Sequence, residues 1–118
     1  MNYDKVADLH IRALPHTPSS RRGVGFVARL YGIVARIGYV KTVNRDGEMV
    51  GVVSGIGRWI LTLVVDPQWQ HKGIGRELIG KLGQRLYVYT EVCTVGFYEK
   101  LGFRKMFTIG PIHFLWRK

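Results

Sequence analysis

Apolar side chains in the first third of the chain recur at the spacing of an α-helix. The first set shares one helical face: Tyr3, Val6, Ala7, His10, Ala13 and Leu14. Pro15 ends this segment, because the residue before a proline disfavours the helical conformation. A second set follows the loop PHTPSSRRG and stops near Gly38: Val24, Val27, Leu30, Tyr31 and Val34. The spacing predicts two amphipathic helices joined by a loop.

The hydrophobic period changes to that of β-strands after Gly38. The β-rich runs YVKTV and MVGVV are separated by Asp46-Gly47, a dipeptide typical of hairpin turns. The next run, WILTLVV, is almost continuously apolar, as in strands that are buried on both faces. Pro67 cannot donate a hydrogen bond to a sheet, so this strand ends or bulges near Asp66. We therefore expect three consecutive strands in this part of the chain.

The last third of the chain alternates between helical and extended patterns. A helix is expected from about Ile74 to Leu82, followed by the strand RLYVYT, the short helix CTVGFYEKLG and a hairpin that turns at Gly110-Pro111. A strand, helix and strand in succession predict a parallel crossover, whereas the hairpins predict antiparallel neighbours. The predicted fold class is α+β, with a mixed central sheet of about six strands flanked by helices. Residues 1–118 are expected to form one domain.

The composition is that of a globular protein without a membrane or export signal. Hydrophobic residues make up 47% of the 118 residues, and no apolar run approaches the ~20 residues of a membrane-spanning helix. The first ten residues lack the apolar segment of a signal peptide, and the single cysteine fits a reducing compartment. We therefore expect a cytoplasmic protein without membrane association.

The formal net charge of +10 is spread evenly along the chain. Residues 1–59 and residues 60–118 each carry nine Lys or Arg and four Asp or Glu. An even distribution favours solubility and a general attraction for anions. It argues against a dedicated nucleic-acid-binding arm.

The stretch QHKGIGREL places two glycines between the apolar strand and the following helix. N–H groups at a helix N-terminus lack acceptors within the helix, and Gly73 and Gly75 remove the Cβ atoms that would keep an anion away from them. Lys72 and Arg76 add positive charge on either side, and His71 lies inside the turn, where it would add a phosphate contact. The turn is a candidate phosphate site; the alternative is a tight strand-to-helix connection.

Dinucleotide-binding and P-loop motifs do not match this turn, because Leu78 stands where a third glycine is needed and Gly-Lys-Ser/Thr is absent. The stretches VVDPQWQHKGIGREL and FYEKLGF instead resemble the GCN5-related N-acetyltransferase (GNAT) superfamily. Gln70, Gly73 and Gly75 match the family's Gln/Arg-x-x-Gly-x-Gly/Ala turn, which holds the pyrophosphate of acetyl-CoA. The second stretch matches a helix and the start of a strand late in the family's domain. The resemblance covers nearly the whole chain and implies the GNAT fold, with acetyl-CoA as cosubstrate.

The resemblance also implies how acetyl-CoA would be held. In the family, the strand matching residues 61–66 bulges and splays from the strand matching residues 86–90, and the pantetheine arm lies in the gap. Leu63, Val64 and Val65 would line this arm, with main-chain contacts from Leu63 and Val65 and the N–H of Val65 near the acetyl carbonyl. The expected cofactor-binding turn comprises Gln70, His71, Lys72, Gly73, Ile74, Gly75 and Arg76.

Two residues are implied as catalytic. Tyr98 matches the tyrosine that protonates the departing CoA thiolate in the family, although an aromatic residue packed at a helix end is the alternative. Some members use a glutamate as general base eleven residues before the turn's glutamine, but Trp59 occupies that position. Glu91 is the best remaining candidate for the base; a helix cap in the same place or a chain of water molecules are alternatives.

The remaining polar residues have simpler interpretations. Cys93 has no neighbouring histidine to activate it, which favours a small core residue over a nucleophile. The four histidines show no metal-ligand spacing, so we expect no metal site. His10 interrupts an apolar helical face, as a hydrogen-bonded interior histidine would. Because the family's acceptor cleft is lined by the early helices, His10 and the Arg21-Arg22 loop are candidates for substrate recognition.

The chain departs from the family in two places. The family usually opens with a β-strand, whereas Met1 lies almost at the first predicted helix. YVKTV would then be an exposed sheet edge, and pairing with a second copy is one way to cover it. In addition, the helix after Gly75 is about two turns shorter than is common in the family.

The function implied by the resemblance is an N-acetyltransferase that moves an acetyl group from acetyl-CoA to a primary amine by direct attack in a ternary complex. The alternative is a non-catalytic acyl-CoA-binding or regulatory module, which the missing glutamate favours. A small basic nucleic-acid-binding protein is a third interpretation, and no recognition motif supports it.

Overall fold

The computed structural model describes residues 3–15, 17–83 and 85–117, with the side chains of residues 91–94 left out. The described helices are α1 (Asp4–Ala13), α2 (Val24–Ile37), α3 (Ile74–Gly80) and α4 (Val92–Lys100), with the short 3₁₀ turns η1 (Ser20–Arg22) and η2 (Pro67–Trp69). The described strands are β1 (Tyr39–Arg45), β2 (Glu48–Ile56), β3 (Trp59–Val65), β4 (Leu86–Glu91), β5 (Arg104–Ile109) and β6 (Ile112–Arg117). The predicted order of helices and strands is confirmed.

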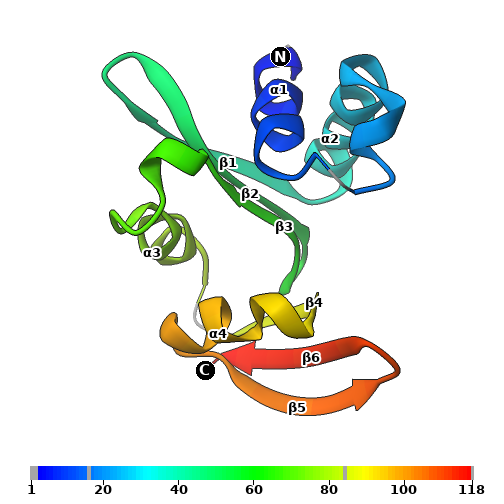
Figure 1. Cartoon of the computed structure of the whole chain (residues 1–118), viewed down its shortest axis with the longest axis vertical. Coiled ribbons are helices and arrows are strands. Elements are labelled where there is room, and N and C mark those ends of the chain that lie inside the picture. Colours follow the sequence, from blue (N-terminus) through cyan, green and yellow to red (C-terminus); the bar gives the residue numbers. More distant parts are fainter. Residues whose placement is uncertain (1–2, 16, 84, 118) are drawn as a thin grey trace.

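The six strands form one sheet in the order β1-β2-β3-β4-β6-β5 (Figure 1). β3 and β4 run parallel, and the other neighbours are antiparallel. The sheet is therefore mixed, as predicted from the single strand–helix–strand unit. β1 lies at one edge, which confirms that YVKTV is an edge strand, and β5 lies at the other.

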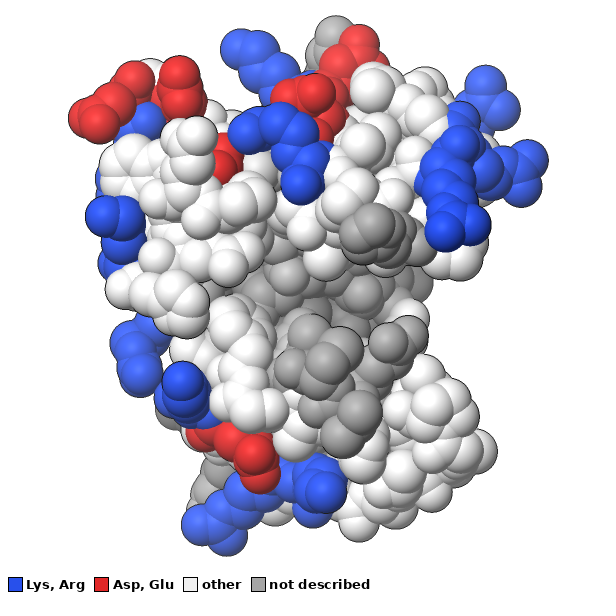
Figure 2. Space-filling view, viewed as in Figure 1, with Lys and Arg blue, Asp and Glu red and all other residues white. Residues whose placement is uncertain are grey.

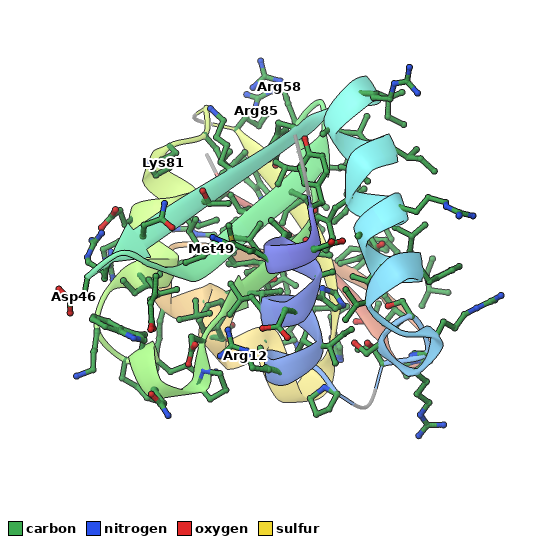
Figure 3. All side chains as sticks on the ribbon, turned by 90° about the horizontal axis from the view of Figure 1, so that it is seen from above. Arg12, Asp46, Met49, Arg58, Lys81 and Arg85 are labelled. Carbon is green, nitrogen blue, oxygen red and sulfur yellow. The ribbon has the colours of Figure 1, made fainter. Side chains whose placement is uncertain are left out.

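Helices cover the sheet unevenly. α1 and α2 lie side by side on one face, where they pack on β1, β2 and β3 (Figure 3). α3 packs on the same strands from the other side, and α4 packs on β4 and β6. Two hydrophobic cores result, one between the sheet and α1 and α2, and one between the sheet and α3 and α4.

Two local expectations differ from the structure. α3 ends at Gly80 rather than near Leu82, and the next two residues continue as a turn with N–H donation to the carbonyl three residues back. Glycine has a low helix propensity, which explains the early end. β3 was expected to be buried on both faces, but Trp59 at its start is 38% exposed and residues 61–63 are half-buried.

None of the helices in the described ranges is long and apolar enough to cross a membrane.

Candidate active site

β3 and β4 separate soon after they meet. Their parallel pairing comprises only Trp59 with Tyr87 and Ile60 with Val88, although β3 continues to Val65. Leu61 is an extra residue on β3, because Ser54 of β2 pairs with Thr62 and Gly55 pairs with Ile60. This β-bulge bends the strand where it leaves β4. The structure thus contains the bulge and the splayed strands that the resemblance implied.

The backbone of β3 beyond the bulge has one edge that is not paired with another strand. The N–H of Asp66 donates to the carbonyl of Val50, and this bond sets which residues of β3 face β2. Backbone groups alternate between the two edges of a strand, so Val64 bonds toward β2 while Leu63 and Val65 direct their N–H and C=O groups toward β4. The gap between β3 and β4 is therefore lined by main-chain donors and acceptors.

A cavity of about 490 Å³ opens at this gap. Its walls come from β3, the turn after η2, α3, α4 and the C-terminal end of α1. The cofactor-binding residues expected from the sequence that line it are Leu63, Val64, Val65, Gln70, His71, Gly73, Ile74, Gly75 and Arg76. Lys72 is exposed and is not part of the wall.

The two glycines of the turn act differently. Gly73 has φ of +85° and His71 has φ of +64°, so the chain turns through two left-handed residues before α3 begins. A Cβ at Gly73 would meet nothing within 4 Å, which leaves the approach to its backbone open. At Gly75, a Cβ would lie 3.1 Å from Cζ of Phe97. Gly75 therefore allows α3 and α4 to pack closely, a role that differs from both the phosphate site and the tight connection expected from the sequence.

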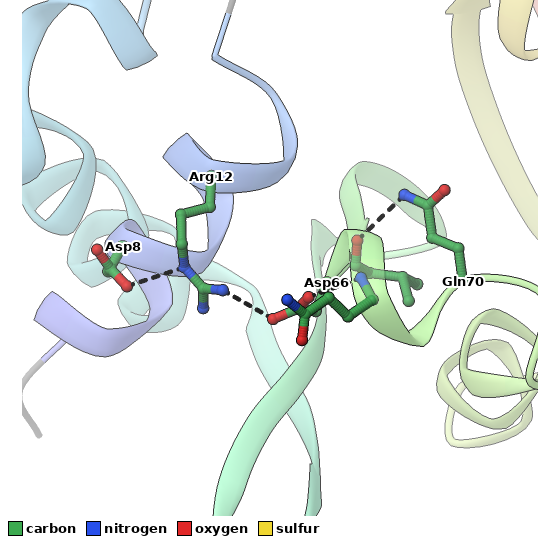
Figure 4. Close-up of polar contacts among 6 residues, drawn as sticks. Asp8, Arg12, Asp66 and Gln70 are labelled. Atoms are coloured by element: carbon green, nitrogen blue, oxygen red, sulfur yellow. Dashed lines mark hydrogen bonds and ion pairs between the residues drawn. The ribbon is translucent and has the colours of Figure 1, made fainter.

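Polar contacts fix the position of the turn (Figure 4). Gln70 Nε2 donates to the carbonyl of Val65 at 3.4 Å, which ties the turn to the end of β3. Asp66 accepts from the backbone N–H of Gln68 at 2.9 Å and from Arg12 of α1 at 2.8 Å. The Gln68 N–H and then Arg12 lower the pKa of Asp66, against the opposing effect of burial. Arg12 also pairs with Asp8 within α1, and its pair with Asp66 holds α1 beside the cavity.

The comparisons with known proteins agree with this geometry. The sequence pattern of the family described as "Acetyltransferase (GNAT) domain" matches residues 22–105. The chain belongs to the GNAT acetyltransferase family. Comparison with curated protein sequences gave no significant match.

Solved structures of similar fold include several acetyltransferases. PH1933 from Pyrococcus horikoshii OT3 superposes with a TM-score of 0.78 at 17% identity, covering 99% of this chain and 90% of that chain. The PaiA N-acetyltransferase of Thermoplasma acidophilum, solved in complex with coenzyme A, gives 0.76 at 17% identity over 98% and 91%. Aminoglycoside 6'-acetyltransferase type Ii gives 0.78 at 18% identity over 98% and 88%. At these identities the likeness establishes the GNAT fold.

Of the two residues expected to be catalytic, the structure describes the side chain of Tyr98 but not that of Glu91. Tyr98 is 7% exposed and packs against Phe97 and Phe103 in the core, one helical position away from the cavity wall. Burial raises the pKa of Tyr98, so its hydroxyl stays protonated. Glu91 ends β4 opposite Ile112, and its side chain lies outside the described residues, as does that of Cys93.

Several wall residues were not expected from the sequence. Ala13 and Leu14 reach the cavity from the C-terminal end of α1 and the residue after it, Trp69 from η2, and Phe97, Lys100 and Leu101 from the end of α4 and the residue after it. The α4 residues lie within FYEKLGF, where only the tyrosine was given a role. Their spacing of three and four residues places them on one helical face, which could have been used to find them. Arg76 donates to the carbonyl of Lys100 at 3.3 Å, so the two cationic residues lie together at the wall.

His10 is an interior histidine, as predicted. Its Nδ1 lies 2.7 Å from the Tyr31 hydroxyl, which donates to Thr62 at 3.1 Å. Thr62 also shares a 2.5 Å hydrogen bond with Ser54. Burial lowers the pKa of His10 and raises that of Tyr31 to about 12, so both groups are neutral at pH 7. This chain of hydrogen bonds joins α1 and α2 to β3 and β2.

In the described part of the chain, no three His, Cys, Asp or Glu side chains are arranged to hold a metal ion.

Proposed function

We propose that this GNAT protein is an acetyl-CoA-dependent N-acetyltransferase that acts on a primary amine by direct attack in a ternary complex. The observation that carries the proposal is the gap between β3 and β4. Pairing stops after Ile60 and Val88, and the edge of β3 at Leu63 and Val65, which no strand pairs, opens into the cavity beside the glycine turn. A pantetheine arm contains amide groups that can pair with such an edge in the manner of an added strand.

The pyrophosphate would lie on the turn formed by residues 70–76. The open approach to Gly73 exposes backbone N–H groups, and Arg76 and Lys100 supply positive charge from the wall. The net charge of +10 adds a general attraction for the anionic cosubstrate. These features support an anionic ligand whose other end is apolar, because most of the cavity wall is apolar.

In the reaction, the neutral amine attacks the thioester carbonyl. The new C–N bond forms, the C–S bond breaks, the amine loses one proton to a base, and the CoA thiolate gains one proton from an acid. A backbone N–H of Leu63 or Val65 would stabilise the oxyanion in between, because both are directed into the gap. We assign Glu91 as the base and Tyr98 as the acid. The raised pKa of Tyr98 keeps its proton available for the thiolate.

Binding of the cosubstrate is tested by thermal shift. Acetyl-CoA at 100 times its Kd should add about 2.7 kcal/mol to the free energy of unfolding. Arg76→Gln and Lys100→Gln should each weaken binding about tenfold, because a charge-assisted contact contributes about 1.5–3 kcal/mol before discounting for solvent. Arg58→Gln is the matched control, because Arg58 lies at the opposite end of the molecule from Arg12 (Figure 3). Equal losses in all three variants would mean that only net charge attracts the ligand, and absence of any shift would contradict the proposal.

A non-catalytic acyl-CoA-binding module is the second candidate. It is favoured by Trp59 in place of the family's glutamate and by the core position of Tyr98. Thiol release measured over an amine panel separates the two functions, with Tyr98→Phe as the control for the acid. Binding without turnover of any amine would favour the module.

Two further properties belong to this proposal. We place the protein in the cytoplasm, in keeping with its single cysteine. We also propose a homodimer in which the β1 edge is paired, because an open strand edge tends to pair with another chain. A molar mass of one chain at all concentrations in light scattering would contradict the dimer.

A further inference from the structure

Five aromatic side chains form a continuous group on the sheet, which we call the aromatic strip: Trp59, Tyr87, Tyr89, Phe107 and Phe114. Trp59 stacks on Tyr87 with ring centroids 5.2 Å apart, and Phe107 stacks on Phe114 at 4.7 Å. Phe114 also contacts Trp59 at 6.4 Å and Tyr89 at 6.3 Å, so it joins the two stacks. The strip crosses four strands, from β3 through β4 and β6 to β5.

The strip lies on the face of the sheet that carries α1 and α2. Ile60 and Val88 point into the core on the side of α3 and α4. Neighbouring residues of a strand point to opposite faces, so Trp59, Tyr87 and Tyr89 point to the other side. α1 and α2 pack on β1, β2 and β3, and their principal contacts do not extend to β4, β6 and β5, which carry the rest of the strip. Tyr89 is 45% exposed and Phe107 is 52% exposed.

The surface around the strip is unusual for so basic a protein. Residues 106–116 contain no Asp, Glu, Lys or Arg, although the chain as a whole has 26 charged residues, 18 basic and 8 acidic. Figure 2 shows this difference: the surface is hollowed between the part formed by α1 and α2 and the part formed by the β5–β6 hairpin, and the hairpin tip carries no charged side chains. An exposed aromatic surface of this kind, in a hollow, indicates a binding site for an apolar group.

The strip begins where the β3–β4 gap opens. Tyr89 is the first residue of β4 after the last pair, Ile60 with Val88. The cavity in the gap has walls from both sides of the sheet, because α1 supplies Ala13 and Leu14 while α3 and α4 supply the other side. A group bound in the gap is therefore accessible from the face that carries the strip.

We propose that the aromatic strip binds the acceptor, and that the acceptor is an arylalkylamine, a primary amine joined by an alkyl spacer to an aromatic ring. The proposal rests on the proposed function, because it assumes that a thioester lies in the gap. The ring stacks on Tyr89 and Phe114, and the amine reaches the thioester carbonyl in the gap.

The position of the strip favours the spacer. Side chains of a sheet stand out from its surface, so a ring stacked on Tyr89 lies above the backbone, whereas a thioester bound along β3 would lie level with it. An alkyl spacer lets the amine reach from the stacked ring down to the thioester carbonyl in the gap. A polyamine fits poorly, because the net charge of +10 repels a polycation.

Turnover with matched amines tests the proposal. 2-Phenylethylamine and 2-cyclohexylethylamine share the spacer and differ in the aromatic ring, aniline has the ring without the spacer, and spermidine is a polyamine. We expect kcat/KM for 2-phenylethylamine to exceed that for 2-cyclohexylethylamine by about three- to tenfold, the range given by one or two ring contacts. Aniline and spermidine should be poorer than both. Preference for the cyclohexyl amine or for spermidine would overturn the proposal.

A variant separates stacking from a general structural role. Tyr89→Leu should raise KM for 2-phenylethylamine about three- to tenfold with little change for 2-cyclohexylethylamine, and Tyr89→Phe should retain the wild-type KM. An equal rise for both amines would contradict stacking. The thermal shift with acetyl-CoA should be the same in wild type and both variants. This control distinguishes failure of the acceptor proposal from failure of the proposed function, which would remove the acetyl-CoA shift in the wild type itself.

Binding is measured independently of turnover. The indole N–H signal of Trp59, assigned with Trp59→Phe, is followed by NMR while 2-phenylethylamine is added to protein saturated with CoA. A saturable shift supports the proposal if the Kd that it gives for 2-cyclohexylethylamine is at least about three times larger than the Kd for 2-phenylethylamine. No shift, or equal affinity for both amines, overturns it. The proposal is also overturned if light scattering shows a dimer for the wild type and a monomer for Tyr89→Leu, because a second copy of the chain would then cover the strip.

Discussion

The two halves of the sheet are built on the same strand pattern but are buried to very different extents. In β2, residues 50–55 are all buried, because α1 and α2 cover one face and α3 covers the other. In β5, every residue is exposed, including Ile109 at 63%. β4 and β6 are intermediate, with α4 on one face and the aromatic strip on the other. Hydrophobic residues occur in both halves, so their presence in a strand does not by itself indicate the core.

The difference in burial indicates that the two halves of the sheet have different roles. The half formed by β1, β2 and β3 is packed between the two hydrophobic cores and holds the glycine turn in place, and one of these cores continues over one face of β4 and β6. The half formed by β4, β6 and β5 leaves an aromatic face open to solvent beside the gap. The gap between β3 and β4 is the boundary between them. We infer that the first half provides most of the stability and that the second half is free to bind ligands.

A pair of alanine substitutions gives the largest test of this comparison. Leu78 of α3 is fully buried against β2, so Leu78→Ala should lower the free energy of unfolding by about 3 kcal/mol through lost burial and the cavity left behind. Ile109→Ala in β5 removes a side chain of similar size, and we expect a loss below about 0.5 kcal/mol. Chemical denaturation measures both. Similar losses for the two variants would show that the halves do not differ in this way.

The hydrogen bonds that join the helices to β3 give the next largest expected change in the free energy of unfolding. Tyr31→Phe removes the hydroxyl that bridges His10 and Thr62, which leaves a buried nitrogen of His10 without that partner. We expect a loss of about 1–3 kcal/mol, again measured by chemical denaturation. Tyr89→Phe removes the same atom from the open half and is the control, expected to be near neutral. A neutral Tyr31→Phe would mean that the chain contributes nothing to the first half.

Much of this comparison could be predicted from the sequence, but only where the relevant contacts are local. Helical spacing and turn residues gave the correct element order, and the Gln70-to-Gly75 spacing placed the turn at a strand-to-helix connection. The Arg12–Asp66 ion pair joins residues 54 positions apart, and no local pattern encodes it. The aromatic strip is likewise not encoded locally, because Trp59 of β3 and Phe114 of β6 come into contact only when the sheet places both strands beside β4. WILTLVV was wrongly expected to be buried throughout for the same reason, since burial depends on which helices pack over each face.

The ion pair between α1 and the end of β3 gives a smaller effect. Asp66→Asn keeps an acceptor for the Gln68 N–H but removes the charge opposite Arg12, whose side chain is 49% exposed. We expect a loss of about 1 kcal/mol after discounting for solvent. Arg12→Gln should cost a similar amount, and the double variant should lose less than the sum. Additive losses, measured in a double-mutant cycle, would mean that the two residues do not interact.

The smallest effect is a dependence of stability on pH in the first half. Burial lowers the pKa of His10 below its ordinary value of 6.5, so the unfolded chain binds more protons than the folded one between that value and the lowered one. Stability should therefore fall as the pH decreases from 7.5 to 5.5. His10→Asn should flatten this dependence while His71 and His113 remain. An unchanged slope in that variant would assign the dependence to other groups.

Amide hydrogen exchange at β3 tests most directly whether the β3–β4 gap holds acetyl-CoA. The N–H groups of Leu63 and Val65 face the gap, whereas that of Val64 already bonds to β2. We predict that saturating acetyl-CoA slows exchange at Leu63 and Val65 by at least about tenfold and leaves Val64 nearly unchanged, because only the first two gain hydrogen-bond partners. Unchanged exchange at Leu63 and Val65 in protein shown by thermal shift to bind acetyl-CoA would contradict the account, since the cosubstrate would then lie outside the gap.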